Sequence, residues 1–199
     1  MAKIASWNVN SIRAREEHLK RWLSDNHVDI LGLQETKVQN QNFPLDFVNQ
    51  LGYQVFYSGQ KSYNGVCILF KGNAKLISDR IPGFSDEQKR VLAVEWKGIL
   101  IINIYVPNGG EIGSEKFAYK INWLGAFCLW IKELNKTFKK IIVLGDFNIA
   151  PTDLDVHDPV LWQDKTLCSK RERGFLKDLK ELGLIETFRQ IDGDTRAFT

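Results

Sequence analysis

The amino-acid sequence predicts an α/β protein in which mixed β-sheets are covered by helices. Short apolar runs typical of strands outnumber the segments with helical spacing, and those helical segments fall between groups of strands. Two adjacent apolar runs are separated only by Lys97 and Gly98, a turn pair that favours an antiparallel hairpin. Antiparallel neighbours in a chain that also contains helices favour mixed sheets.

Seven apolar runs are predicted to be strands, because each is rich in aliphatic, β-branched or aromatic residues. In chain order they cover residues 3–9, 28–33, 53–58, 65–70, 91–96, 99–105 and 140–145. No internal repeat and no linker rich in Pro, Gly or Ser separates them, so we expect a single domain.

Three segments carry apolar residues at the spacing of one helix face. They cover residues 14–24, 114–134 and 172–182. Ser114 is a residue type that caps helix N-termini, so it suits the start of the second segment. Gly183 suits the position that follows the third segment.

The composition indicates a soluble globular protein with a substantial core, since 44% of the 199 residues are hydrophobic and 26% are charged. The formal net charge of +3 is too small to indicate nucleic-acid binding by itself. No apolar run approaches the roughly 18 residues of a membrane helix, and the N-terminus turns polar too soon for a signal peptide. Three scattered cysteines favour a reducing, cytoplasmic location.

Four of the predicted strands end in short polar clusters. The clustered side chains are Asn8 and Asn10, Glu35 and Lys37, Tyr105 and Asn108, and Asp146 and Asn148. Because successive strand residues alternate between the two faces, residues two apart can point in the same direction. Ligand sites of layered α/β folds commonly lie at strand ends, so these clusters are expected to converge.

Carboxylate and amide oxygens without a cluster of His or Cys suit a hard cation such as Mg²⁺ or Mn²⁺. Glu35 and Asp146 are the carboxylates that such a site would use. The alternative is that each acid caps a helix or tightens a turn, and for any single acid this is the favoured interpretation. Turn chemistry is also favoured for Asp153 and Asp155, whereas four similar strand ends together favour a shared site.

Five segments, in this order and at these spacings, resemble the exonuclease III family of apurinic/apyrimidinic endonucleases. They are IASWNVNSIRAR, ILGLQETK, GYQVFYSGQKSYNGVCIL, NIYVPNG and LGDFNIAPTDLD. This family belongs to the larger endonuclease/exonuclease/phosphatase superfamily, and the resemblance covers nearly the whole chain. QETK and GDFNIAPTDLD are close to family signatures, whereas LGDFN alone would indicate only the superfamily.

The resemblance implies a four-layer α/β sandwich of two mixed sheets flanked by helices, and Mg²⁺-dependent cleavage of duplex DNA 5′ to abasic sites and at 3′ ends. It implies metal binding by Glu35, with Asn8 as a direct or outer partner. It places Asp146, also near the metal, where it orients or deprotonates the attacking water. Asn148 would hold water, phosphate or metal, and Tyr105 would contact the phosphate or assist the leaving group.

The same resemblance implies contacts with the DNA backbone. The residues in question are Asn10, Arg13, Lys37, Asn108 and Arg173. Around Arg173 the sequence reads CSKRERGF, and this Lys-Arg run departs from the usual family pattern. The expected partner is duplex DNA with abasic sites or 3′ ends, bound by a monomer without membrane association.

In the family a Trp-rich strand begins near the position of Ala197, followed by an Arg-Ile-Asp motif and a Ser-Asp-His motif. This sequence has no such segment, so we expect a domain that is incomplete at its C-terminus, with an open strand edge and exposed apolar surface. We therefore expect the chain assayed alone to cleave an abasic duplex weakly or not at all.

Two other functions stay open at this point. The first is a superfamily phosphodiesterase that acts on a phospholipid, an inositol phosphate or RNA, although QETK, SIRAR and the GQK loop argue against it. The second is a DNA-binding remnant without catalytic activity. The sequence leaves the number of metal ions open, and also the balance of endonuclease, exonuclease and 3′-phosphatase activity.

Overall fold

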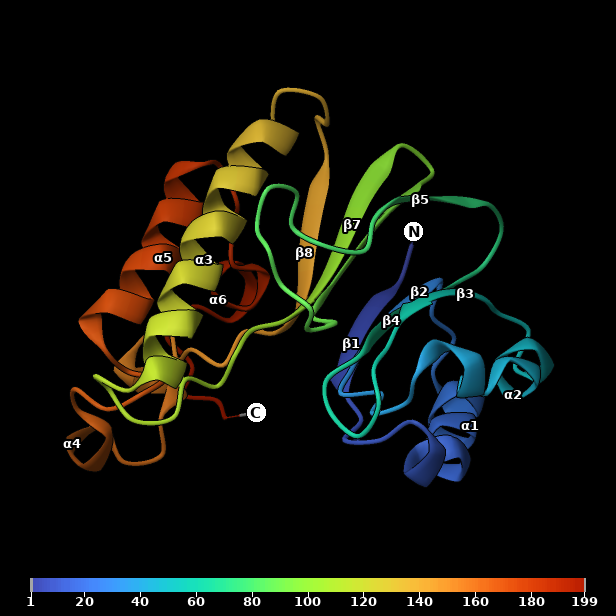
Figure 1. The fold of residues 1–199 in the computed structure, drawn as a ribbon, viewed down its shortest axis with the longest axis horizontal. Coiled ribbons are helices and arrows are strands. Elements are labelled where there is room, and N and C mark those ends of the chain that lie inside the picture. The colour runs from blue at the N-terminus through green and yellow to red at the C-terminus, as the bar shows by residue number, and fades with distance from the viewer. Residues whose placement is uncertain (1, 199) are drawn as a thin grey trace. The chain divides into compact units, whose positions relative to one another are not determined.

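The chain forms two compact units in the computed structural model, which describes residues 2–198. The first unit consists of residues 2–105 together with Phe138–Asp146, and it contains every strand of the described chain. The second unit consists of Val106–Thr137 together with residues 147–198, and it is helical. Figure 1 shows the elements of both units with their labels.

Two mixed sheets of four strands each build the first unit. Sheet A has the order β1-β2-β4-β3 and contains β1 (Ile4–Asn8), β2 (Ile30–Gln34), β3 (Gln54–Ser58) and β4 (Val66–Phe70). Its β1 and β2 are parallel, whereas β4 is antiparallel to both β2 and β3. The central strands β2 and β4 are buried along their whole length, which explains their unbroken apolar runs.

Sheet B repeats this mixture of parallel and antiparallel neighbours. It has the order β5-β6-β7-β8 and contains β5 (Ala74–Ser78), β6 (Val91–Trp96), β7 (Ile99–Tyr105) and β8 (Ile141–Asp146). Its β5, β6 and β7 are antiparallel in turn, and β7 is parallel to β8. Lys97 and Gly98 have φ values of 49° and 74°, so the predicted tight hairpin joins β6 to β7.

Two apolar layers hold the first unit together. One lies between the sheets and is centred on buried Ile68, Val94 and Ile101. The other packs sheet A against α1 (Glu16–Asp25) and α2 (Leu45–Gln50), as Figure 1 also shows. Two short 3₁₀ turns complete this unit, η1 (Arg13–Arg15) and η2 (Asn40–Asn42).

The second unit is built around two long helices that lie side by side (Figure 1). Its elements are α3 (Glu115–Leu134), η3 (Asp153–Asp155), α4 (Pro159–Trp162), α5 (Lys170–Glu181) and α6 (Thr187–Asp192). Ser114 caps α3 by accepting a hydrogen bond from the amide of Phe117 at 3.2 Å. Ser169 and Glu172 form a reciprocal capping box at the start of α5.

The predicted α/β class with two mixed sheets is confirmed, and all seven predicted strands are present. Four elements were missed, namely β5, α2, α4 and α6. The helices among these have six residues or fewer, and β5 is a five-residue strand with no buried position and a register irregularity, so none shows a clear periodicity. Within residues 2–198, no helix is both long and apolar enough to cross a bilayer.

Gly145 occupies a position that should tolerate no side chain. Its φ is 137°, and a Cβ added there would lie 2.0 Å from the backbone oxygen of Ile104 on the neighbouring strand. We expect Gly145→Ala to lower the free energy of unfolding by about 3 kcal/mol or more, because the backbone of β7 or β8 must move. Urea denaturation measures this change.

Gly72→Ala is the matched control for that variant. Gly72 also has a positive φ, 78°, but a Cβ there would meet no atom within 4 Å. We expect it to cost only about 1 kcal/mol, from backbone strain alone. Equal losses in the two variants would contradict the steric argument.

Candidate active site

The carboxyl ends of β1, β2, β7 and β8 bring together the side chains predicted to form a site in the first unit. In the parallel pairs, Asn8 lies opposite Gln34 and Tyr105 lies opposite Asp146, so both pairs of strands end level with each other. On their strands, Asn8, Tyr105 and Asp146 point to the same side as the apolar residues that fill the layer between the sheets. Leu144, for example, lies two residues before Asp146 and belongs to that layer. The apolar interface therefore becomes polar at this edge.

Asn8 links the two carboxylates of the cluster. Its Nδ2 donates to Oε1 of Glu35 at 2.8 Å and to Oδ2 of Asp146 at 2.8 Å. Its Oδ1 accepts a hydrogen bond from the amide of Asn10 at 3.1 Å, which fixes the orientation of the side-chain amide. Glu35 and Asp146, far apart in the chain, thus meet at one amide group as the sequence predicted.

A tight turn after β2 directs Glu35 toward this cluster. Glu35 and Lys37 both have a φ of 53°, a left-handed conformation that is unfavourable for side chains of this kind. Hydrogen bonds from neighbouring segments hold the turn, including Ser11 N to Glu35 O at 2.7 Å and Lys37 N to Asn64 O at 2.9 Å. Backbone strain of this kind is typical of functional sites, where the surrounding structure must maintain it.

The electrostatic environment keeps Glu35 ionised. Partial burial raises the pKa of its carboxyl group, but hydrogen bonds from Asn8, Lys37 and Tyr105 outweigh burial, and the pKa lies below its usual range. Lys37 Nζ forms an ion pair with Oε2 of Glu35 at 2.9 Å. The site therefore holds a carboxylate at neutral pH.

Tyr105 is kept protonated by the same environment. Burial, the nearby charge of Glu35 and a hydrogen bond with that carboxylate raise the pKa of Tyr105 to about 12. Arg90 opposes this shift: its guanidinium carbon lies 4.7 Å from the centroid of the Tyr105 ring, and its NH1 donates to the backbone oxygen of Tyr105 at 3.0 Å. The phenol is therefore a hydrogen-bond donor over the whole physiological range.

This shift predicts how the stability contribution of Tyr105 depends on pH. Because the folded pKa lies above the ordinary value of 10.0, folding favours the protonated phenol. Its contribution is present below the unfolded pKa and is lost as the pH rises toward the folded pKa. We expect the stability difference between wild type and Tyr105→Phe to stay constant up to about pH 9 and to shrink as the pH rises from about 10 toward about 12 in urea denaturation series.

Tyr63→Phe is the control for that series, because Tyr63 is 71% exposed. A Tyr105 difference that stays constant or grows with pH would contradict the assignment. Proteolysis or circular dichroism at each pH should verify that the starting state is folded.

The remaining candidates of the first unit lie beside this cluster. Asn10 Oδ1 accepts a hydrogen bond from Lys37 Nζ, so these two predicted DNA contacts touch each other. Arg13 lies in η1, and its NH2 donates to the backbone oxygen of Asn42 at 2.7 Å. Lys37 therefore contacts both Glu35 of the carboxylate cluster and Asn10 beside it.

Asn108 and Asn148 belong to the second unit, where a buried lysine connects their backbones. Lys120 Nζ donates to the carbonyl oxygen of Asn108 at 3.1 Å and to that of Asn148 at 2.6 Å. It also forms an ion pair with Oε1 of Glu172 at 2.5 Å, with both side chains 0% exposed. The side chain of Asn148 donates to the carbonyl oxygen of Val106 at 2.9 Å.

Arg173, the last predicted contact, is held by the turn that follows Asn148. Its Nε donates to the oxygen of Ala150 at 3.0 Å, and its NH2 pairs with Asp153 Oδ1 at 2.9 Å. Asp155 closes a capping box with Thr152 in this turn. Turn chemistry, which the sequence favoured for Asp153 and Asp155, is therefore confirmed.

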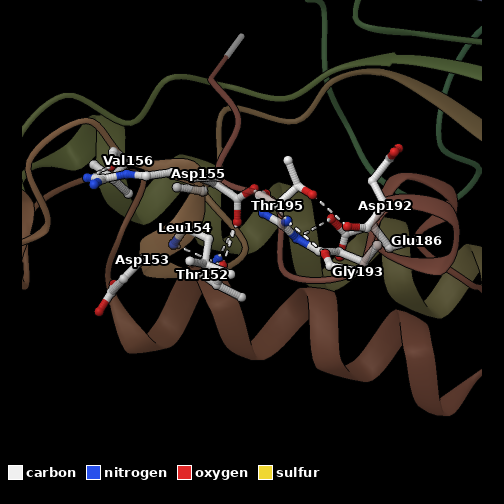
Figure 2. Close-up of polar contacts among 12 residues, drawn as sticks. Thr152, Asp153, Leu154, Asp155, Val156, Glu186, Asp192, Gly193 and Thr195 are labelled. Carbon is white, nitrogen blue, oxygen red and sulfur yellow. Dashed lines mark hydrogen bonds and ion pairs between the residues drawn. The ribbon is translucent and has the colours of Figure 1, made fainter.

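A second arginine fixes the same turn from the C-terminal side. Arg189 of α6 pairs with Asp155 and donates to the carbonyl oxygens of Gly193 and Thr195 at 3.1 Å and 2.5 Å. Figure 2 shows this network, with the turn around Asp155 beside Gly193 and Thr195. The segment after Asn148 is thus rigidly held within the second unit.

Sequence reasoning missed four polar residues that support the site, namely Arg90, Asn103, Lys120 and Glu172. All four are 9% exposed or less. Their burial depends on partners far along the chain, so no local pattern distinguishes them from surface residues. The one available signal was Asn103, a polar residue inside the apolar run ILIINIY.

The donor set of the first unit fits a hard divalent cation. Glu35 and Asp146 supply carboxylate oxygens at one point, and Mg²⁺ characteristically takes one or two protein carboxylates and completes its shell with water or phosphate. In the described part of the chain no group of three or more His, Cys, Asp or Glu side chains is placed to hold a metal.

Two carboxylates, an amide and a phenol at the strand ends of two mixed sheets suit the hydrolysis of phosphate esters. Residues 5–195 match the Endonuclease/Exonuclease/phosphatase family, and the chain belongs to this family. It is an enzyme of the nuclease type, as its relatives show.

Similar proteins cover almost the whole chain. Exodeoxyribonuclease III of Haemophilus influenzae is 33% identical over 96% of this chain and 76% of its own length. The structure of the 3′ phosphatase NExo from Neisseria, bound to a product DNA hairpin, has a TM-score of 0.89 and 38% identity over 96% of this chain and 75% of its own. The structure of an AP endonuclease from Archaeoglobus fulgidus has a TM-score of 0.93. It is 36% identical to this chain and covers 100% of this chain and 77% of its own length.

Proposed function

We propose that this enzyme is a Mg²⁺-dependent DNA-repair nuclease that hydrolyses phosphodiester bonds 5′ to abasic sites and at the 3′ ends of duplex DNA. The observation that carries the proposal is the convergence of Glu35 and Asp146 on Asn8, with Tyr105 hydrogen-bonded to Glu35. The names of its relatives, exodeoxyribonuclease III and AP endonuclease, support DNA as the substrate.

Glu35 and Asp146 would hold the cation, with Asn8 beside them in the same unit. A bound Mg²⁺ or Mn²⁺ supplies neutralisation of charge on the phosphate oxygens. Asn8 presents its Nδ2 rather than its oxygen to both carboxylates, so its role in this arrangement is to orient them.

Asp146 is suited to accept the proton of the attacking water. A positioned base of this kind contributes about 10²–10⁴-fold to the rate. Tyr105 carries its proton at neutral pH, so its phenol can donate a hydrogen bond to a phosphate oxygen or to the leaving oxygen. Lys37 adds a positive charge beside Glu35, where a phosphate would otherwise meet only carboxylates.

DNA binding would use Asn10, Arg13 and Lys37 from the first unit and Asn108 and Arg173 from the second. Contacts of this type bind the phosphate backbone, so affinity should fall as salt rises. The net charge of +3 is modest, which favours a few local contacts over a broadly basic surface. We propose that the enzyme acts as a monomer in the cytoplasm, with chromosomal DNA as its partner.

Removal of a 3′ phosphate from DNA is the second candidate activity. The solved structure of a 3′ phosphatase, 38% identical to this chain, favours it. Both activities break a P–O bond at a 3′ position, and one arrangement of carboxylates and phenol can serve both.

The test is a substrate panel assayed with Mg²⁺ and with EDTA. It contains an abasic duplex, a duplex with a recessed 3′ end, a 3′-phosphorylated duplex, an inositol phosphate and RNA. We expect any Mg²⁺-dependent turnover to be confined to the DNA duplexes and to be weak on the abasic duplex, in line with the expectation from the sequence, with none of the inositol phosphate or RNA. Turnover of the inositol phosphate or RNA would show that the chain is a phosphodiesterase for another substrate. DNA binding without turnover would favour a DNA-binding remnant without catalytic activity.

A further inference from the structure

A buried pair of amide side chains connects the two sheets of the first unit. Gln34 on β2 and Asn103 on β7 are 1% and 0% exposed. Gln34 Nε2 donates to Asn103 Oδ1 at 2.7 Å, and Asn103 Nδ2 donates to the carbonyl oxygens of Leu33 and Cys67 at 2.9 Å and 2.8 Å. Asn103 therefore reaches from sheet B to the backbone of two strands in sheet A.

This pair lies in a layer that is mainly apolar. Gln34 Nε2 also donates to the hydroxyl of Ser6 at 3.1 Å, whereas other residues of the layer are aliphatic or aromatic, such as Ile68 and Ile101. Gly32 leaves room beside the pair, because a Cβ there would lie 2.1 Å from Cδ1 of Leu144 and 3.1 Å from Cγ of Asn103. Buried amides must satisfy specific hydrogen-bond partners, so this pair favours one arrangement of the two sheets.

The amide pair lies directly next to the candidate active site along both strands. Gln34 precedes Glu35, and Asn103 stands two residues before Tyr105 on the same strand face. Two contacts of the site also cross between the sheets: Asn8 to Asp146, and Tyr105 to Glu35. The geometry of the site consequently depends on how the two sheets are aligned.

We propose that Gln34 and Asn103 are positioning residues, which lock the alignment of the sheets and thereby place Glu35 and Asp146 at one cation site. The inference rests on the proposed function, because it assigns the locked geometry to metal binding and phosphodiester cleavage. An apolar pair would fill the same space but would not select one alignment, because its contacts lack direction.

The test compares two amide variants with one control of the same layer. Asn103→Val removes one amide, and Gln34→Met/Asn103→Val removes both while keeping an apolar filling of similar volume. Val94→Ala is the control: Val94 is 0% exposed in the same layer, so its truncation loosens packing but leaves the amide pair intact. All variants are studied at a temperature at which each is fully folded by circular dichroism.

We expect Mn²⁺ affinity, measured by calorimetry, to weaken at least about tenfold in both amide variants and to stay unchanged in Val94→Ala. Where turnover is measurable, kcat should fall about 10²-fold with a smaller change in KM. Amide variants that bind Mn²⁺ as tightly as Val94→Ala does would overturn the proposal, since loosened packing alone would then explain every effect.

A third readout separates this inference from the proposed function. The side-chain amide of Asn8 donates to both carboxylates, so its NMR resonance reports their alignment without metal or DNA. We expect that resonance to move in both amide variants and to keep its position in Val94→Ala. A wild-type chain without DNA turnover would contradict the proposed function, while this resonance would still decide whether the amide pair aligns the site.

Discussion

Asp146→Asn is expected to lower kcat for DNA hydrolysis by about 10³-fold. The asparagine amide cannot take a proton from the attacking water, and the site loses one of its two carboxylates. The hydrogen bond from Asn8, 2.8 Å to Oδ2, can still be accepted by the amide oxygen of the new side chain, so the local structure should persist. Steady-state kinetics on the best substrate of the panel measures the loss.

The fold of the variant and the affinity for Mn²⁺ separate chemistry from folding. We expect an unfolding midpoint within about 2 °C of wild type, and Mn²⁺ binding weakened about tenfold or more. Asp46→Asn is the matched control, because Asp46 is an exposed acid of the same unit in α2. Unchanged kcat in Asp146→Asn would remove Asp146 from the reaction, and an equal loss in Asp46→Asn would point to a nonspecific charge effect.

The convergence of the site could be predicted because its signal is local. Each strand that carries a site residue shows an apolar run followed at once by an acid, amide or phenol, as in the passage from Leu144 to Asp146. Alternation along a strand then predicts which side chains share a face. The structure adds the reason for convergence: the parallel pairs end level, with Asn8 opposite Gln34 and Tyr105 opposite Asp146.

The support of the site could not be predicted, because it consists of buried polar groups with distant partners. Arg90 lies over the ring of Tyr105, and Lys120 reaches Glu172 across 52 positions of the chain. A single sequence shows such residues as ordinary charged positions, since charged side chains are mostly exposed. The left-handed turn at Glu35 is equally hidden, because nothing in QETK requires a positive φ.

The structure shows how each candidate residue is held within its own unit. Asn8, Glu35, Tyr105 and Asp146 lie in the first unit, where Asn8 donates to both carboxylates. Asn108, Asn148 and Arg173 lie in the second, where Lys120 and the turn around Asp155 hold them. The sequence grouped all of them by family resemblance alone, and these supporting contacts lie outside any local pattern.

Lys120→Met is expected to cost about 3–5 kcal/mol of unfolding free energy, the largest stability change proposed for this chain. The substitution leaves Glu172 as a fully buried carboxylate without its cation, 0% exposed. It also removes the donor to the carbonyl oxygens of Asn108 and Asn148. Urea denaturation followed by tryptophan fluorescence measures the loss, and Lys177→Met of the exposed pair with Glu181 should cost about 1 kcal/mol or less.

The double variant Lys120→Met/Glu172→Gln decides which part of that cost is electrostatic. Glutamine removes the stranded charge, and its one side-chain oxygen can still accept from the amide of Ser169, as Glu172 does at 3.2 Å, although the amide of Leu167 loses its acceptor. We expect the double variant to regain about half or more of the lost stability, because a neutral buried pair avoids the desolvation of an unpaired ion. If the double variant is no more stable than the single one, the loss comes from the two released carbonyl groups, and Lys120 acts mainly as their donor.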